Sequence, residues 1–208
     1  ARCPVLTFGD LGEVRARDVR LDEVLRPTFR LESPWGRAEV TLDARGGHMV
    51  ANALAAAAVG LVEGVGLDEV AAGLAEARLS RWRMEVVTGG SGCTVVNDAY
   101  NANPASTLAA LDALVALPGG GRRIAVLGVM AELGDDGPTA HVAVAGRAVD
   151  LGVEVLAVGT DLYGMDGLED PDAVLAVLAE CGLGPGDAVL VKGSRVAGLE
   201  AVVDGLLA

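Results

Sequence analysis

An alternation of short apolar strands and helical segments from position 83 onward most constrains how this chain can fold. One strand-like run ends at Val95-Val96, and three others cover 123–127, 154–158 and 188–191. Helical segments cover 104–117, 141–151, 172–180 and 196–207. Such alternation is typical of parallel strands, which need long crossover connections. We therefore predict a Rossmann-like, doubly wound, mostly parallel sheet over residues 81–208.

The first eighty residues have a different pattern. Partial two-residue alternation predicts short strands at 5–8, 13–21, 28–32 and 37–42. An Ala-rich segment at 48–63 and a second segment at 67–77 predict two helices. The sequence thus predicts an α/β chain in which a smaller part, residues 1–80, combines antiparallel strands with two helices.

Composition excludes several classes of protein. Of the 208 residues 51% are hydrophobic, which predicts a packed core, and the net charge of −13 argues against a nucleic-acid or anionic-membrane surface. We expect neither a membrane span nor a signal peptide, since no apolar run is long enough and no charged segment precedes one at the start. Cys3, Cys93 and Cys181 are widely spaced, which predicts reduced thiols in a cytoplasmic protein.

Three polar segments follow predicted strands, where open α/β sheets bind ligands. Residues 97–104 combine Asp98 and Tyr100 with three asparagines, although a turn with a helix cap is the alternative explanation. Residues 128–134 could equally be a tight strand-to-helix turn. Residues 192–195, Lys-Gly-Ser-Arg, would open the last helix with two cations, which suits a carboxylate or a phosphate.

The two histidines are weaker candidates for catalytic residues, and a common phosphate-binding motif is missing from the sequence. His48 and His141 are far apart, and neither has a Ser or Cys partner pattern, so each is more simply a capping or packed histidine. The sequence contains no G-x-x-x-x-G-K-[ST] phosphate loop.

The segment Asn-Asp-Ala-Tyr-Asn-Ala-Asn-Pro at 97–104, with Ser106 shortly after it, resembles the hallmark of the D-alanyl-D-alanine-adding members of the Mur ligase family. Four further segments agree in order and spacing with that family: 47–56, 83–86, 126–134 and 192–195. The resemblance covers essentially the whole chain.

The resemblance implies an ATP-dependent amide ligase of peptidoglycan synthesis, and hence a role in cell-wall biogenesis, cell shape and cell division. In such a ligase ATP, with Mg²⁺, phosphorylates the terminal carboxylate of UDP-MurNAc-tripeptide, and the amine of D-Ala-D-Ala attacks the acyl phosphate. It also implies a cytoplasmic, monomeric parent enzyme that acts on small molecules and has no nucleic-acid or membrane partner.

The resemblance also implies roles for individual residues. The predicted ATP contacts are His48, Asn52, Arg83, Asp98 and Tyr100. Among them, Asn52 would contact the adenine, Arg83 would contact the phosphates and Asp98 would contact the ribose. The predicted substrate contacts are Asn101, Asn103, Lys192, Ser194 and Arg195, the last three at the dipeptide carboxylate. No residue of the chain is predicted to be a metal ligand or is assigned with certainty to catalysis.

The family also has an N-terminal domain for the UDP-sugar, and a phosphate loop with magnesium ligands in its central domain. Neither is in this sequence, so we expect a C-terminal fragment that is inactive alone. It would consist of a partial central ATP-binding domain (1–80) and a C-terminal domain (81–208). A partial sheet exposes an edge, which predicts lower stability or self-association of residues 1–80.

Two alternatives to this interpretation remain open. One is a non-catalytic module, derived from a Mur ligase, that binds D-Ala-D-Ala or a nucleotide. The other is a different ligase of the same superfamily, against which the run from Tyr100 to Asn103 argues.

Overall fold

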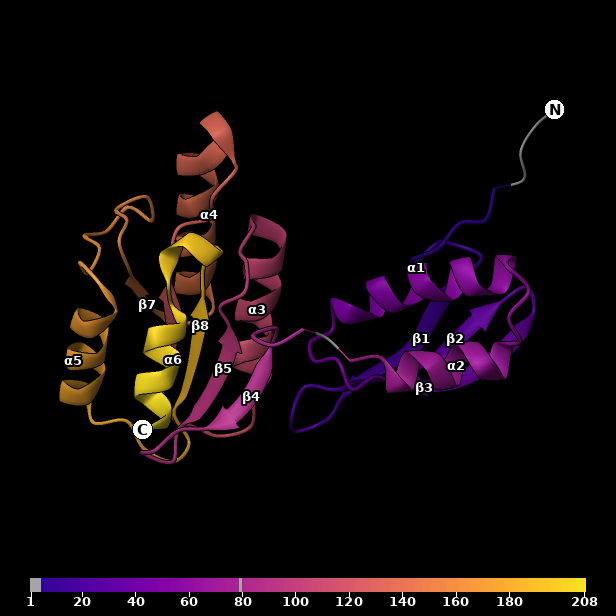
Figure 1. The fold of residues 1–208 in the computed structure, drawn as a ribbon, viewed down its shortest axis with the longest axis horizontal. Helices are drawn as coiled ribbons and strands as arrows, with labels where there is room; N and C mark the ends of the chain where they lie inside the picture. Colours follow the sequence, from indigo (N-terminus) through magenta and orange to yellow (C-terminus); the bar gives the residue numbers. More distant parts are fainter. Residues whose placement is uncertain (1–4, 79) are drawn as a thin grey trace. The chain divides into compact units, whose positions relative to one another are not determined.

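The computed structural model describes residues 5–78 and 80–208, which form two compact units divided after position 79 (Figure 1). Cys3 lies outside the described residues. No helix among those residues has the length and apolar character needed to span a bilayer. The expected α/β class, with an antiparallel part before a mostly parallel one, is confirmed.

The first unit is built on a three-stranded antiparallel sheet in the order β1-β2-β3. Its strands are β1 (Arg15–Leu21), β2 (Pro27–Ser33) and β3 (Gly36–Thr41). Ser33 pairs with Gly36, so Pro34 and Trp35 form a two-residue hairpin loop. Gly36 has φ +133°, a backbone conformation that residues with a Cβ rarely adopt.

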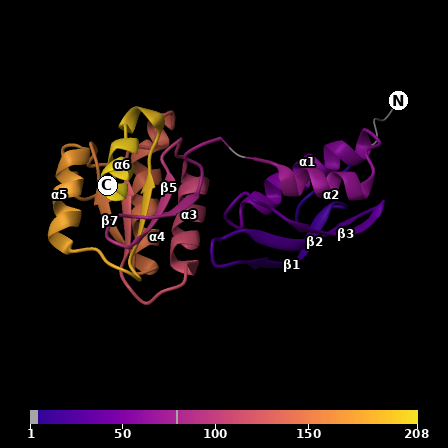
Figure 2. The ribbon, with the colours of Figure 1, turned by 60° about the horizontal axis from the view of Figure 1, so that its bottom comes forward.

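Two helices, α1 (Met49–Val62) and α2 (Leu67–Glu76), cover one face of this sheet (Figure 2). Phe29 and Leu31 of β2 point into the core beneath the helices, whereas Arg30 between them is exposed and Thr28 before them is half-buried. The two-residue period of the strand therefore sorts apolar from polar side chains. From α1, Leu54 and Leu61 complete the buried cluster.

The second unit contains a five-stranded sheet in the order β4-β5-β8-β6-β7. Its strands are β4 (Glu85–Thr88), β5 (Thr94–Asp98), β6 (Arg123–Leu127), β7 (Glu154–Ala157) and β8 (Ala188–Lys192). Strand β4 runs antiparallel to β5, and every other neighbouring pair is parallel. The last strand in the chain, β8, thus lies between β5 and β6.

Helices cover both faces of this sheet (Figures 1 and 2). The helices are α3 (Pro104–Ala116), α4 (Gly137–Asp150), α5 (Pro171–Cys181) and α6 (Glu200–Leu207). They pack as two pairs, α3 with α4 and α5 with α6. Helices α5 and α6 share a core with Val126 of β6 and with Val189 and Val191 of β8. All three central strands are buried, which explains the continuous apolar runs of β6 and β8.

Some expected boundaries were wrong. Residues 5–8 form no strand but only an isolated bridge from Phe8 to Val14, because Gly9, at φ +107°, reverses the chain there. The edge strand β4 was not predicted, since its four residues, Glu-Val-Val-Thr, form neither an alternating pattern nor a long apolar run. The last helix begins at Glu200, not at 196: a short 3₁₀ turn over Arg195–Ala197 precedes it and Gly198, at φ +61°, separates the two.

An ion pair joins the amino ends of β6 and β8. The carboxylate of Asp187 accepts hydrogen bonds from the Arg122 guanidinium (Nη2–Oδ2 2.7 Å), the Arg122 backbone N–H (2.7 Å) and the Gly184 backbone N–H (3.0 Å). The guanidinium, together with these N–H groups, holds the pKa of the Asp187 carboxyl well below its usual range.

We expect Asp187→Asn to lower the free energy of unfolding by about 2 kcal/mol at pH 7, because an amide cannot accept these charge-assisted bonds equally well. Since the folded pKa is depressed, the stabilisation is present above the unfolded pKa of about 3.9 and is lost as the pH falls towards the folded value. Urea titrations between pH 7 and pH 3 should therefore show the two proteins converging in acid.

The control for this variant is Asp112→Asn, which removes the exposed ion pair of Asp112 with Arg147 (2.7 Å). Exposed pairs contribute little, so we expect a change of less than about 1 kcal/mol. A stability gap for Asp187→Asn that stays constant from pH 7 to pH 3 would contradict the prediction.

Candidate functional site

The carboxyl ends of three strands meet at one edge of the parallel sheet. Asp98 of β5 lies beside Lys192 of β8, which in turn lies beside Leu127 of β6. The loops that follow these strands are the three polar segments expected to bind ligands, so the topology brings all three together. Only the position of β8 between β5 and β6 makes this possible.

Lys192 is buried at this edge, with 2% of its surface exposed. Its Nζ lies 2.5 Å from Oδ2 of Asp98 and donates a hydrogen bond of 2.8 Å to the backbone oxygen of Asn101. A buried ammonium is tolerated when it is paired and hydrogen-bonded in this way. The sequence predicts that Lys192 contacts a carboxylate of the substrate, whereas in this structure its carboxylate partner is Asp98.

Asp98 also fixes the segment that leads into β4. Its Oδ1 accepts a hydrogen bond of 3.1 Å from the backbone N–H of Met84, and the N–H of Tyr100 donates to the carbonyl oxygen of Trp82 at 3.2 Å. Trp82 and Met84 have left-handed backbones, with φ of 65° and 51°. For residues with a Cβ this conformation costs about 1–2 kcal/mol each, so the surrounding bonds must hold it.

Two arginines lie close over aromatic rings beside this segment, and the guanidinium carbon of a third, Arg81, lies 5.7 Å from the centroid of the Trp82 ring. The guanidinium carbon of Arg83 lies 4.1 Å from the centroid of the Tyr100 ring, and that of Arg195 lies 4.1 Å from the Trp82 ring. Such stacking orients a guanidinium while its N–H groups stay available to an anion. Tyr100 is 39% exposed and the Arg195 side chain 52% exposed, so both lie at the surface of the edge.

Ser194 is buried and ties the three loops to one another. Its Oγ accepts a hydrogen bond of 2.9 Å from the N–H of Ala131 in the loop after β6. The same hydroxyl donates to the carbonyl oxygen of Ala102, in the loop after β5, at 3.4 Å. In this structure Ser194 therefore contributes to the shape of the edge.

The two asparagines of the loop after β5 also have local partners. Oδ1 of Asn101 accepts from the N–H of Ala102 at 2.9 Å. Oδ1 of Asn103 accepts from the N–H of Ser106 at 2.9 Å, which makes Asn103 the N-cap of α3, with Pro104 at the first helical position. Both asparagines are exposed, so their predicted contacts with substrate stay predictions.

Comparison with known proteins gives the family. Residues 82–195, more than half of the chain, match the family model described as "Mur ligase, glutamate ligase domain". The chain belongs to the Mur ligase family. It is 43% identical to the UDP-N-acetylmuramoyl-tripeptide–D-alanyl-D-alanine ligase of Mycobacterium bovis, an alignment that covers 100% of this chain and 47% of that protein.

Solved structures agree with this membership of the Mur ligases. MurF from Acinetobacter baumannii superposes with a TM-score of 0.87 at 28% identity, covering 97% of this chain and 46% of that one. A MurF ligase from Thermotoga maritima, solved in complex with ADP, superposes with a TM-score of 0.80 at 26% identity, covering 97% of this chain and 48% of that one. The chain thus spans about half the length of the Mur ligases it matches.

A buried polar network supports the loop after β6 in this Mur ligase chain. The N–H of Met130 donates to Nε2 of His141 at 2.8 Å, and Nδ1 lies 2.7 Å from the carbonyl oxygen of Gly137. These partners require a neutral ring with its proton on Nδ1. Tyr163 packs edge-on against His141 and donates to the oxygen of Gly128 at 2.8 Å, and burial raises the pKa of this phenol. His141 is thus packed, as predicted, whereas the role of Tyr163 was not foreseen.

The other two predicted ATP contacts of the Mur ligase chain lie in its first unit. His48 immediately precedes α1 and is half-buried. Asn52 is exposed on α1, where its Nδ2 lies 3.5 Å from the sulfur of Met49. Their roles towards a nucleotide stay predictions.

The described residues of the second unit include cations that suit an anion but no cluster that suits a metal ion. Over 5–78 and 80–208, no three His, Cys, Asp or Glu side chains are grouped closely enough to hold a metal. Arg83 and Arg195 instead offer oriented guanidinium groups, which suit phosphate or carboxylate oxygens. We therefore derive no step through Mg²⁺ from these residues.

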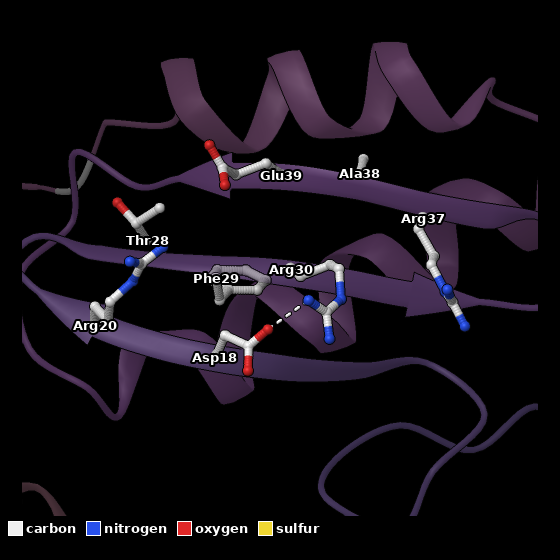
Figure 3. A pocket seen from close by; sticks show the side chains of 8 residues that line it. All are labelled: Asp18, Arg20, Thr28, Phe29, Arg30, Arg37, Ala38 and Glu39. Carbon is white, nitrogen blue, oxygen red and sulfur yellow. Dashed lines mark hydrogen bonds and ion pairs between the residues drawn. The ribbon is translucent and has the colours of Figure 1, made fainter.

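A hollow of about 210 Å³ on the open face of the β1-β2-β3 sheet was not predicted from the sequence. Figure 3 shows Arg20, Arg30 and Arg37 around it, and Arg30 paired with Asp18. Glu32 also lies within ion-pair distance of Arg30 (3.4 Å) and Arg37 (3.3 Å). A network of exposed, mutually compensated charges is an ordinary feature of a sheet surface, and we assign it no ligand.

We expect His141→Phe to lower the free energy of unfolding by about 2–4 kcal/mol, since it leaves the N–H of Met130 and the carbonyl of Gly137 without their partner. Thermal or urea unfolding measures the change. The control is Val142→Thr, at the next, exposed position of α4, which should leave the transition unchanged. Coincident transitions for His141→Phe and the unaltered chain would contradict the prediction.

Proposed function

We propose that this chain is part of an ATP-dependent ligase that adds D-Ala-D-Ala to UDP-MurNAc-tripeptide in peptidoglycan synthesis. The observation that carries the proposal is the assembly of the three polar loops at one edge of the sheet, in a chain 43% identical along its whole length to a relative named for that activity. A ligase of this kind must position polar substrates and offset the charge on the transferred phosphoryl group.

The loop after β8 would bind the dipeptide. Lys192 and Ser194 are buried and bound to protein atoms, so direct contact with the D-Ala-D-Ala carboxylate falls to Arg195. Its guanidinium is exposed and lies over the Trp82 ring, with Glu200 only at the limit of ion-pair distance (4.0 Å), so a carboxylate can reach it for a bidentate pair. Asn101 and Asn103, on the neighbouring loop, would present amide groups to the incoming amine end.

Residues of the second unit would also hold part of the nucleotide. Arg83, stacked on Tyr100, would contact the phosphates, and Asp98 would accept from the ribose hydroxyls, because each carboxylate oxygen can accept more than one hydrogen bond. ATP, with Mg²⁺, would supply the phosphoryl group that activates the tripeptide carboxylate. The residues described here bind and orient, and we assign none of them a proton transfer.

We expect calorimetric titration to show saturable binding of D-Ala-D-Ala to this chain. Arg195→Ala should weaken the binding by about tenfold to a hundredfold, the usual loss for one charge-assisted pair. Arg147→Ala, which removes an exposed arginine of α4, is the matched control and should bind as the unaltered chain does. Equal affinities of all three proteins would remove Arg195 from the site, and no binding by any of them would count against the dipeptide assignment.

We expect this chain alone to release no phosphate from Mg-ATP in the presence of UDP-MurNAc-tripeptide and D-Ala-D-Ala. Its sequence contains no G-x-x-x-x-G-K-[ST] loop to hold the β- and γ-phosphates. A coupled phosphate assay, with each substrate omitted in turn, measures this. Phosphate release that requires both substrates would show that the described residues suffice for the reaction.

A further inference from the structure

We infer that Lys192 is a positioning residue: through Asp98, its buried ammonium holds the segment 82–84 in the conformation that presents Arg83 and Arg195 to a ligand. The inference rests on the proposed function only for the identity of the ligands. It assigns to Lys192 a task that differs from the substrate contact its sequence position suggests.

The first step is the burial of the ammonium. Nζ of Lys192 reaches Oδ2 of Asp98 on the neighbouring strand and the carbonyl oxygen of Asn101 in the loop beyond it. With 2% of its surface exposed, the side chain has its charge compensated inside the protein. A lysine so placed fixes the position of the carboxylate and of the loop after β5.

The second step is the use of the other carboxylate oxygen. Oδ1 of Asp98 accepts a hydrogen bond from the N–H of Met84. Met84 is buried, and its backbone is left-handed with φ 51°. A left-handed residue with a Cβ reverts to the right-handed or extended region unless its neighbours prevent it. Rotation of Asp98 would therefore release Met84 and, with it, the adjacent backbone of Arg83.

The third step links the two arginines. Trp82 has φ 65°, and its carbonyl oxygen accepts from the N–H of Tyr100, so its ring position depends on the same loop that Lys192 holds. The guanidinium carbon of Arg195 lies 4.1 Å from the centroid of the Trp82 ring, and that of Arg83 lies 4.1 Å from the centroid of the Tyr100 ring. One buried ion pair thereby orients two surface guanidinium groups that come from different segments of the chain.

Tryptophan fluorescence tests this inference without any ligand. The sequence has two tryptophans, so Trp35→Phe leaves Trp82 as the single emitter. In that background we expect Lys192→Met to shift the Trp82 emission to longer wavelength and to raise its quenching by acrylamide under conditions where the protein is folded. Arg195→Ala calibrates the signal, since it removes directly the nearer of the two guanidinium groups that lie over the Trp82 ring.

The control is Asp187→Asn, which breaks the ion pair at the opposite ends of the strands. It should lower stability and leave the Trp82 emission unchanged. If Lys192 only stabilised the fold, Lys192→Met would behave in the same way, and a folded Lys192→Met protein with unchanged emission would overturn the inference.

A second variant keeps the test decisive if Lys192→Met does not fold. Asp98→Asn is nearly isosteric and weakens the pair, so we expect a smaller shift of the Trp82 emission in the same direction. Unchanged emission of this variant would likewise reject the inference. Because these measurements need no ligand, absence of D-Ala-D-Ala binding by the unaltered chain would reject the proposed function and leave the role of Lys192 standing.

Discussion

The contact between Lys192 and Asp98 lies where β5 and β8 end side by side, and the arrangement of the surrounding loops follows from it. A charge removed from water must be compensated by partners in fixed positions. Asp98 supplies one partner and the carbonyl of Asn101 another, while the second carboxylate oxygen holds Met84. The backbone beside this pair includes two residues in left-handed conformations, Trp82 and Met84.

The edge also shows how an acidic chain can offer a place for anions. The net charge is −13, yet Arg83 and Arg195 gather beside Trp82 and Tyr100. Each guanidinium lies over an aromatic ring, and an oxyanion can accept from two N–H groups of one guanidinium at once. Net charge governs the long-range field around the protein, whereas binding of a small anion depends on a few oriented cations.

The sequence predicted most of the fold because burial in β6 and β8 requires continuous apolar runs, and the crossovers between parallel strands require helices. It failed where local signals are weak. The edge strand β4 is short and half-exposed, and the apolar residues near position 5 lie beside a glycine turn and not in a sheet. The N-cap at Asn103 was predictable because its chemistry is local, whereas the start of the last helix depends on the left-handed Gly198.

By itself, the sequence determined the class of fold, the positions of the three polar loops and the membership of a ligase family that its motifs indicate, since all of these depend on residue order and local pattern. Tertiary structure decided which polar side chains face solvent. Lys192 and Asp98 are 94 positions apart, and only the insertion of β8 between β5 and β6 makes them neighbours. A lysine in a polar loop looks the same in sequence whether its ammonium meets a ligand or a buried carboxylate, because burial is a property of the packed strands around it.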